Sequence, residues 1–346
     1  MQTYTRSAAR IASAAFVLIV GATAIAYSAV RLAQPGIAEI SLGGEAAAAA
    51  EANPDGYTYR RYTDPPRTEI SDRSGKRIAV MTDGARTGHL AGPVRVFAEP
   101  RFTNAKIEND TYVRMAPQEW RAGAEKEPWF TAWFAAALTD PKPDLLATAL
   151  EYTYGAPPRK DDKGVQFSGD AAFGPLSDID PDGRAENSDF YDYLGMSWTF
   201  PDGVKEKPSP THLYSLDCSG FVRMVYGYRM GYPLRGANQP GGGLPRQAHA
   251  IASMGPGVLL MPNTGKRARE LERLLPGDML FFNAGPVQGA NIEHMGIYLG
   301  VDDRGHQRFI SSRSQANGPT MGDLAGESVL DGTGYWALRW RTARRV

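Results

Sequence analysis

The stretch Leu216-Asp217-Cys218-Ser219-Gly220-Phe221 contains the only cysteine of this 346-residue chain. The residues after it predict a helix, because apolar side chains recur at helical spacing over 221–228. Cys218 would then lie in the first turn, where unpaired N–H groups and the helix dipole favour an anion and lower the pKa of a thiol. We expect a reactive thiolate; the alternative is an inert, buried cysteine.

A second block, Glu293-His294-Met295-Gly296-Ile297-Tyr298-Leu299-Gly300, follows downstream and predicts a short strand. Turn residues occupy 301–305, and 308–311 predicts the returning strand of a hairpin. A thiol at a helix start and a histidine presented by a later strand are the minimum apparatus of a cysteine nucleophile. A structural histidine at a sheet edge is the alternative for His294.

Pairing across the predicted turn places Ser311 near His294, and a slip of one residue would place Ser312 there instead. His306 lies beside the turn, so we interpret it as a solvated loop histidine.

Three blocks together resemble the NlpC-type cell-wall cysteine peptidases: Asp-Cys-Ser-Gly-Phe-Val at 217–222, Pro-Gly-Asp at 276–278 and His-Met-Gly-Ile-Tyr-Leu-Gly at 294–300. The resemblance covers about 144–346. It implies an α+β, papain-like catalytic domain, with N-terminal helices packed on an antiparallel sheet. Members of the family cut stem peptides of peptidoglycan, commonly between D-γ-glutamate and diaminopimelate.

By this resemblance, Cys218 is the nucleophile, His294 the base and Ser311 the third catalytic residue. The family usually has a third polar residue, often histidine, at the position that Ser311 occupies here. A serine hydroxyl can orient an imidazole, but it cannot stabilise the imidazolium as a carboxylate would. Ser312 and His306 therefore stay open as alternatives for the third position.

The resemblance also implies substrate-binding residues. Asp217 and Ser219 would hold the free amino end of the stem peptide, and Tyr154 lies in a turn that resembles the family's tyrosine-containing turn. Neither a cofactor nor a metal is implied.

The chain departs from the family in length. The segment 144–152 predicts the first helix, capped by Asp144, but about sixty residues intervene before Cys218. This insertion, at about 156–210, is rich in aromatic residues, so it is either a cover over the active-site groove or an elaboration packed outside the domain. Within it, Asp178 to Asp189 matches part of a calcium-loop pattern, although a solvated acidic turn explains the run equally well.

The N-terminal third divides into three segments that differ in composition. Residues 1–33 have a basic N-terminal part, an apolar middle and small residues at the end of the apolar stretch. This pattern predicts a secretory signal peptide or an uncleaved membrane anchor. Residues 34–65 predict a low-complexity linker. Residues 66–117 predict a small β-rich region, either a separate barrel or an extension packed on the catalytic domain, which would occupy 118–346.

The composition and motifs of the chain argue against several other classes of protein. Lysine plus arginine and aspartate plus glutamate both number 38, so no net field attracts nucleic acid. The chain has no glycine-rich phosphate loop after a strand, no His/Cys metal spacing and no heptad run.

We therefore expect a secreted or cell-surface bacterial cysteine endopeptidase, a monomer whose partners are peptidoglycan stem peptides. Membrane contact would come only through the N-terminal segment if it is not cleaved. Two alternatives remain open: an amidase or acyl transferase on the same scaffold, and a wall-peptide-binding module whose catalysis has weakened.

Overall fold

The computed structural model describes residues 51–52, 56–180 and 183–346, which all belong to one compact unit. The expected signal peptide or anchor, 1–33, lies outside the described residues, as does most of the expected linker. Within the described parts of the chain, no helix has the length and apolar character needed to cross a membrane. Helices and antiparallel sheets both occur, so the α+β class is confirmed.

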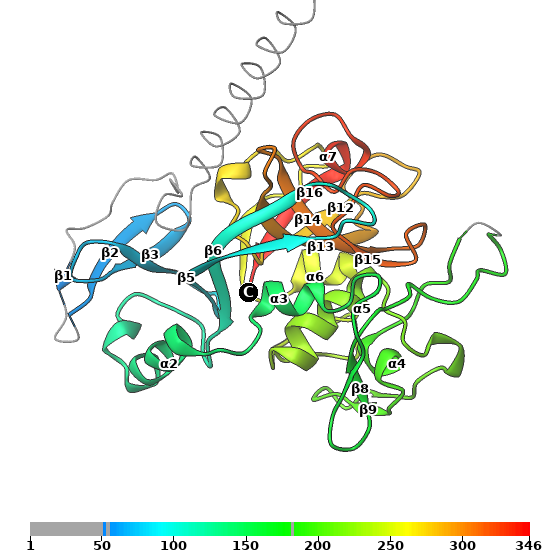
Figure 1. The fold of residues 1–346 in the computed structure, drawn as a ribbon, viewed down its shortest axis with the longest axis horizontal. Helices are drawn as coiled ribbons and strands as arrows, with labels where there is room; N and C mark the ends of the chain where they lie inside the picture. Colours follow the sequence, from blue (N-terminus) through cyan, green and yellow to red (C-terminus); the bar gives the residue numbers. More distant parts are fainter. Residues whose placement is uncertain (1–50, 53–55, 181–182) are drawn as a thin grey trace, which may run out of the picture. The chain divides into compact units, whose positions relative to one another are not determined.

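The N-terminal region is a six-stranded antiparallel meander in which each strand pairs with the next (Figure 1). Its strands are β1 Glu51–Ala52, β2 Thr58–Thr63, β3 Pro66–Ser71, β4 Arg77–Thr82, β5 Thr87–Ala98 and β6 Lys106–Met115. Helix α2, Pro128–Thr139, buries Phe130 and Phe134 against the apolar face of this sheet. The sheet therefore begins within the stretch predicted to be linker.

This meander is bonded to the rest of the chain by buried polar contacts. The amide N–H of Thr87 donates to the carbonyl oxygen of Val346 over 2.7 Å. The Glu99 carboxylate accepts hydrogen bonds from the Thr320 hydroxyl at 2.7 Å and the Met321 amide at 2.8 Å. Among the described strands no pairing joins β6 back to β1, so the sheet is open. These contacts are typical of an extension packed on a larger domain.

The second six-stranded sheet has the order β11-β16-β12-β13-β14-β15 and carries the histidine block. Its strands are β11 Val258–Met261, β12 Met279–Phe282, β13 His294–Val301, β14 Gln307–Arg313, β15 Gly318–Thr320 and β16 Trp340–Arg345. Alternate residues of β12 enter two cores, because successive side chains point to opposite faces. Met279 and Phe281 belong to the larger core, and Leu280 and Phe282 belong to a smaller one around Trp336.

Helices cover the face of this sheet that carries the larger core (Figure 1). The remaining helices are α3 Leu145–Leu150, α4 Phe190–Leu194, α5 Cys218–Arg223, α6 Ala248–Met254 and α7 Tyr335–Arg339, with 3-10 turns at Ala124–Lys126, Pro210–His212 and Leu271–Arg273. The Asp144 carboxylate accepts from the Ala147 amide, which confirms the predicted cap of the first helix. Helix α5 continues as a π-helix over Met224–Arg229.

The insertion at 156–210 contains two small ribbons, β7 Arg159–Lys160 with β8 Gln166–Ser168 and β9 Trp198–Thr199 with β10 Lys205–Glu206. Its aromatic residues do not form an exposed cover: Phe190 is fully buried and stacks edge-on against Trp198. Tyr193 is also fully buried. The aromatic centre of the insertion is therefore part of the larger core.

Candidate active site

Cys218 is the first residue of α5, as predicted, and Asp217 is its N-cap. The Asp217 carboxylate accepts from the Gly220 amide at 2.7 Å, while the Asp217 amide donates to the carbonyl oxygen of Ser188 at 2.8 Å. A Cβ at Gly220 would lie 2.1 Å from that same Ser188 oxygen. Glycine at this position therefore lets the insertion pack directly against the turn that carries the thiol.

The thiol lies against the backbone at the start of β13. Cys218 Sγ is 3.9 Å from the carbonyl oxygen of Glu293, to which it donates, and the Met295 amide also hydrogen-bonds to it. The two predicted blocks are thus brought together around His294. Among the described residues no hydrogen bond joins Sγ to the His294 ring, so the two groups share one strand end without forming a closed pair.

The expected low pKa of the thiol is wrong. Burial raises the pKa of Cys218 above its ordinary value, and the neighbouring carboxylates of Asp217 and Glu186 raise it further. The helix start would favour a thiolate, but its own N-cap is an anion next to the sulfur. Glu186 comes from the insertion, which sequence spacing could not place here.

The environment of His294 is apolar and aromatic. The residue is 7% exposed, and its ring lies 4.5 Å from the Trp336 ring, centroid to centroid, at an interplanar angle of 32°. Nε2 is buried and has no hydrogen-bond partner. Burial lowers the pKa of His294 to about 3, the positive charge of Arg313 acts in the same direction, and Asp217 opposes them. The imidazole is therefore neutral at physiological pH.

The hairpin register decides which residue of β14 lies across from His294. Ile297 pairs with Ile310 and Tyr298 with Phe309, and continuing this register places Arg313, not Ser311, across from His294. Ser311 lies two pairs inward, opposite Gly296, with its Cβ beside that glycine. The Ser311 hydroxyl accepts a hydrogen bond from Arg313 Nε at 3.0 Å.

The two alternatives for the third residue lie elsewhere. Ser312 Oγ donates to the carbonyl oxygen of Leu216 at 2.5 Å, towards the nucleophile helix. His306 lies at the far end of the hairpin, half exposed, with Nδ1 2.8 Å from the Asp331 carboxylate. Ser311 is therefore the only one of the three on the same face of the hairpin as His294.

Asp217 and Ser219 are already engaged with an arginine. Arg246 Nη2 donates to Asp217 at 2.8 Å, and Nη1 donates to the Ser219 hydroxyl at 2.8 Å. Burial alone would raise the pKa of Asp217, but Arg246 and the hydrogen bonds from Gly220 and Ser219 hold it below its ordinary value. Arg246 also lies 3.4 Å from Asp189, which pairs in turn with the buried Arg223. The expected amine-binding pair is thus part of a closed ionic network.

Tyr154 is 54% exposed and packs against the β5–β6 loop. The Arg101 guanidinium lies 3.5 Å from its ring centroid, and Phe102 meets it edge-on at 6.0 Å. Neither of the clefts described next includes Tyr154 in its lining.

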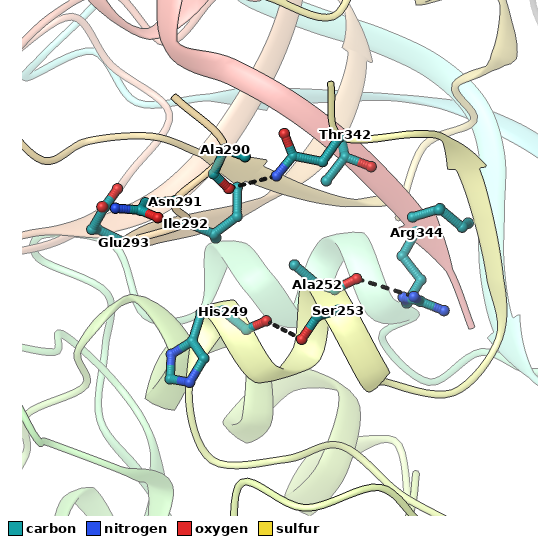
Figure 2. A pocket seen from close by; sticks show the side chains of 11 residues that line it. His249, Ala252, Ser253, Ala290, Asn291, Ile292, Glu293, Thr342 and Arg344 are labelled. Atoms are coloured by element: carbon teal, nitrogen blue, oxygen red, sulfur yellow. Dashed lines mark hydrogen bonds between the residues drawn. The ribbon is translucent and has the colours of Figure 1, made fainter. Parts of the chain in front are cut away.

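Two clefts flank the segment that precedes β13, and Glu293 lines both. The first has a volume of about 740 Å³. Its lining includes His294, two carboxylates and three aromatic side chains: Glu186 from the insertion, Glu293 just before β13, and Phe173, Tyr335 and Trp336. The second, of about 560 Å³, lies between α6 and β16. Figure 2 shows His249 and Ser253 of α6 on one side of it and Ile292 on the other. The insertion thus contributes Phe173 and Glu186 to the wall of the cleft that contains His294, although Cys218 is not in its lining.

Sequence reasoning missed Glu186, Arg246, Arg313 and Trp336. Only Arg313 carried a usable signal, because it follows Ser311 by two and must share its face of a strand. The others meet the site through tertiary packing.

The structure does not support a calcium ligand at Asp189, the last residue of the calcium-loop pattern. Asp189 caps α4 and pairs with Arg223, so its carboxylate is committed. Pro181 and Asp182 lie outside the described residues. Among the residues the structure describes, no group of three or more His, Cys, Asp or Glu side chains is placed to hold a metal ion.

Comparison with known proteins adds one finding. The model of the NlpC/P60 family matches residues 195–341, the segment that contains Cys218, His294 and Ser311. No curated protein shows significant similarity to the chain. The match begins inside the insertion and ends in β16, so it spans the helix that begins at Cys218 and the sheet that carries His294. Residues 195–341 of this chain are therefore similar to the NlpC/P60 family.

Proposed function

We propose that this protein is an exported cysteine peptidase that hydrolyses peptide bonds in peptidoglycan stem peptides. The NlpC/P60 family suggests cell-wall peptidase activity. The observation that supports the proposal most directly is the position of the single thiol, at the start of α5 and against the backbone of Glu293 and Met295, beside His294. The bond between D-γ-glutamate and diaminopimelate is the one that the family resemblance favours.

The mechanism begins from a neutral pair. Cys218 Sγ attacks the scissile carbonyl carbon while its proton passes to His294, and the C–N bond then breaks as His294 protonates the leaving amine. The resulting thioester is hydrolysed by a water molecule that His294 deprotonates, which regenerates the thiol. No cofactor takes part.

The two ring nitrogens of His294 differ in their access to the thiol proton. Nε2 is buried without a partner, whereas Nδ1 is not among the buried unpartnered atoms and has no hydrogen bond among the described residues. Nδ1 is therefore the accessible nitrogen that accepts the thiol proton. Catalytic hydrogen bonds are often loose without substrate and tighten in the complex, so the open Cys218–His294 geometry is compatible with this step.

The helix start supplies the oxyanion donor. The first amides of a helix have no intrahelical acceptor, and among the described residues the Cys218 N–H donates no hydrogen bond. The developing oxyanion would bind there.

The role of the other predicted site residues follows from their partners. We propose that Ser311 acts on the base indirectly, by accepting from Arg313. Asp217 and Ser219 meet the substrate only where it can compete with Arg246. Tyr154 would bind substrate only in an extended groove beyond the two clefts.

A second candidate is a wall-peptide-binding module with weakened catalysis. Three observations favour it: the raised thiol pKa, the lowered imidazole pKa and the buried Nε2 without an orienting partner. An amidase or acyl transferase would use the same thiol chemistry, and only the products distinguish it.

The test is incubation of the purified full chain with defined muropeptides, followed by mass analysis of the fragments. We expect cleavage within the stem peptide by the unmodified protein and none by Cys218→Ala, which should keep its melting temperature. Release of intact stem peptides would identify an amidase instead. Binding without fragments, equal in both proteins, would identify the binding module.

Export is proposed from the N-terminal sequence alone. Cell fractionation with mass analysis of the N-terminus tests it: we expect the protein outside the cytoplasm, with the first 33 or so residues removed or embedded in the membrane.

A further inference from the structure

The His294 ring belongs to a cluster with two aromatic rings, which also contact each other. The His294 ring lies against Trp336 at 4.5 Å and within 5.9 Å of Phe282, centroid to centroid. Trp336 belongs to α7 and is fixed by its own hydrogen bond, from Nε1 to the carbonyl oxygen of Ala325 at 3.0 Å. The rotation of the imidazole is therefore limited by a ring that cannot itself turn freely.

A buried arginine completes this stack. The Arg313 guanidinium carbon lies 4.8 Å from the Trp336 ring centroid, and the residue is 3% exposed. Its donors are all directed to neutral acceptors: Ser311 Oγ at 3.0 Å, Ser328 Oγ at 2.7 Å and the carbonyl oxygens of Leu324 and Gly326 at 3.2 and 2.7 Å. Its nitrogens thus all bond within the protein, and no carboxylate in the described part of the chain forms an ion pair with it; Glu99 and Asp323 act on its charge only at longer range.

His294 lacks the hydrogen bond that usually orients a catalytic imidazole. A catalytic imidazole is normally oriented by a hydrogen bond to its second nitrogen. Here that nitrogen, Nε2, is buried and unpartnered. Ring stacking is the contact that remains to set the plane of the base.

We propose that Trp336, held in place by Arg313, is the positioning residue for His294, so that stacking orients the base where a third polar residue would otherwise do so. The proposal rests on the proposed function, because it assigns a role in that reaction. The same arrangement keeps the base neutral, since protonation would create an imidazolium beside a guanidinium, in a site where Nε2 has no acceptor.

Charges on every side of the base are accounted for. Arg313 faces it from β14, and Asp217 acts on it from the cap of α5 with opposite sign. Glu293 immediately precedes β13, and Glu186 lines the same cleft from the insertion. Removing Arg313 should therefore leave the negative charges as the main electrostatic influence on the pKa of His294, and raise that pKa.

The experiment measures the titration of His294 by NMR in the full chain with labelled histidine, and the steady-state kinetics of the same proteins. The chain has five histidines, so His294→Ala identifies the resonance. The variants are Arg313→Met, Arg313→Lys, Trp336→Leu and Trp336→Phe. Arg339→Met is the matched control, because Arg339 also lies over a ring at this cleft, that of Tyr335 at 4.4 Å, and not over Trp336.

We expect Arg313→Met to shift the His294 titration midpoint upward and to move the acid limb of the kcat/KM profile with it. Arg313→Lys keeps the charge and should leave the midpoint low. Trp336→Leu should lower kcat about 100-fold with little change in KM, as displacement of a catalytic group does, whereas Trp336→Phe should keep most of the activity. Arg339→Met should change neither quantity.

An equal shift in Arg339→Met, an unchanged midpoint in Arg313→Met, or full kcat in Trp336→Leu would overturn the proposal. Failure of the proposed function looks different: the unmodified protein would release no fragments, while the His294 titration could still be measured in every variant.

Discussion

The thiol and the imidazole lie at the same end of β13, yet their surroundings carry opposite charges. Cys218 is next to the carboxylates of Asp217 and Glu186, which favour the protonated thiol. His294 is buried against Trp336 and faces Arg313, which favours the unprotonated ring. A preformed thiolate–imidazolium pair would need the reverse arrangement. The comparison therefore indicates a resting site in which both groups are uncharged and the proton moves only as the substrate is attacked.

The largest effect should come from removing the base. His294→Ala leaves a protonated thiol without a proton acceptor, so kcat/KM should fall by about 10²–10⁴, the usual contribution of general acid–base catalysis. Steady-state kinetics on a defined muropeptide measures this. Activity close to that of the unmodified protein would show that the thiol ionises without His294, and the neutral-pair account would be wrong.

A smaller effect is expected at Ser311. Ser311→Ala removes one of the four acceptors that hold Arg313, so we expect a loss of about tenfold in turnover, or about 1.4 kcal/mol. Ser312→Ala and His306→Ala are matched controls, because their side chains bond elsewhere.

Two outcomes would change this weighting. A loss in Ser311→Ala as large as that in His294→Ala would make Ser311 a direct partner of the base. No loss in Ser311→Ala, with a clear loss in a control, would move the third role to the control residue.

The smallest effect should come from Glu186→Gln. The carboxylate raises the thiol pKa, so neutralising it lowers that pKa and increases the thiolate fraction at a given pH. Alkylation of Cys218 should become faster near neutral pH, with less than about a tenfold change in kcat/KM. Glu119→Gln, an exposed carboxylate outside both clefts, is the control. Equal changes in the two variants would remove the specific role of Glu186.

Local patterns predicted what local forces determine. The cap at Asp144, the start of α5 at Cys218 and the strand at His294 all follow from short-range spacing, and the structure has them there. The same patterns misjudged the thiol pKa, because Glu186 approaches from a distant segment. They also left the insertion open between a cover and an exterior elaboration; most of its aromatic residues lie in the larger core, while Phe173 lines the cleft beside His294.

Contacts between residues far apart in the sequence also could not be predicted. Arg246 closes the network around Asp217 across 29 positions of sequence, and no local motif announces that contact. Trp336 reaches the base from the far end of the chain. Arg313 was within reach, since the hairpin register that selected Ser311 also places Arg313 on its face.

The most direct test of the neutral-pair account is the pH dependence of alkylation at the single thiol of the native protein. Because the chain has one cysteine, iodoacetamide incorporation followed by mass spectrometry reports on Cys218 alone. If both groups are neutral at rest, alkylation should be slow between about pH 5 and 7, with a midpoint above the ordinary thiol value of about 8.5. Rapid alkylation at pH 5–7, with a midpoint well below that value and lost in His294→Ala, would show a preformed ion pair and contradict the neutral-pair account.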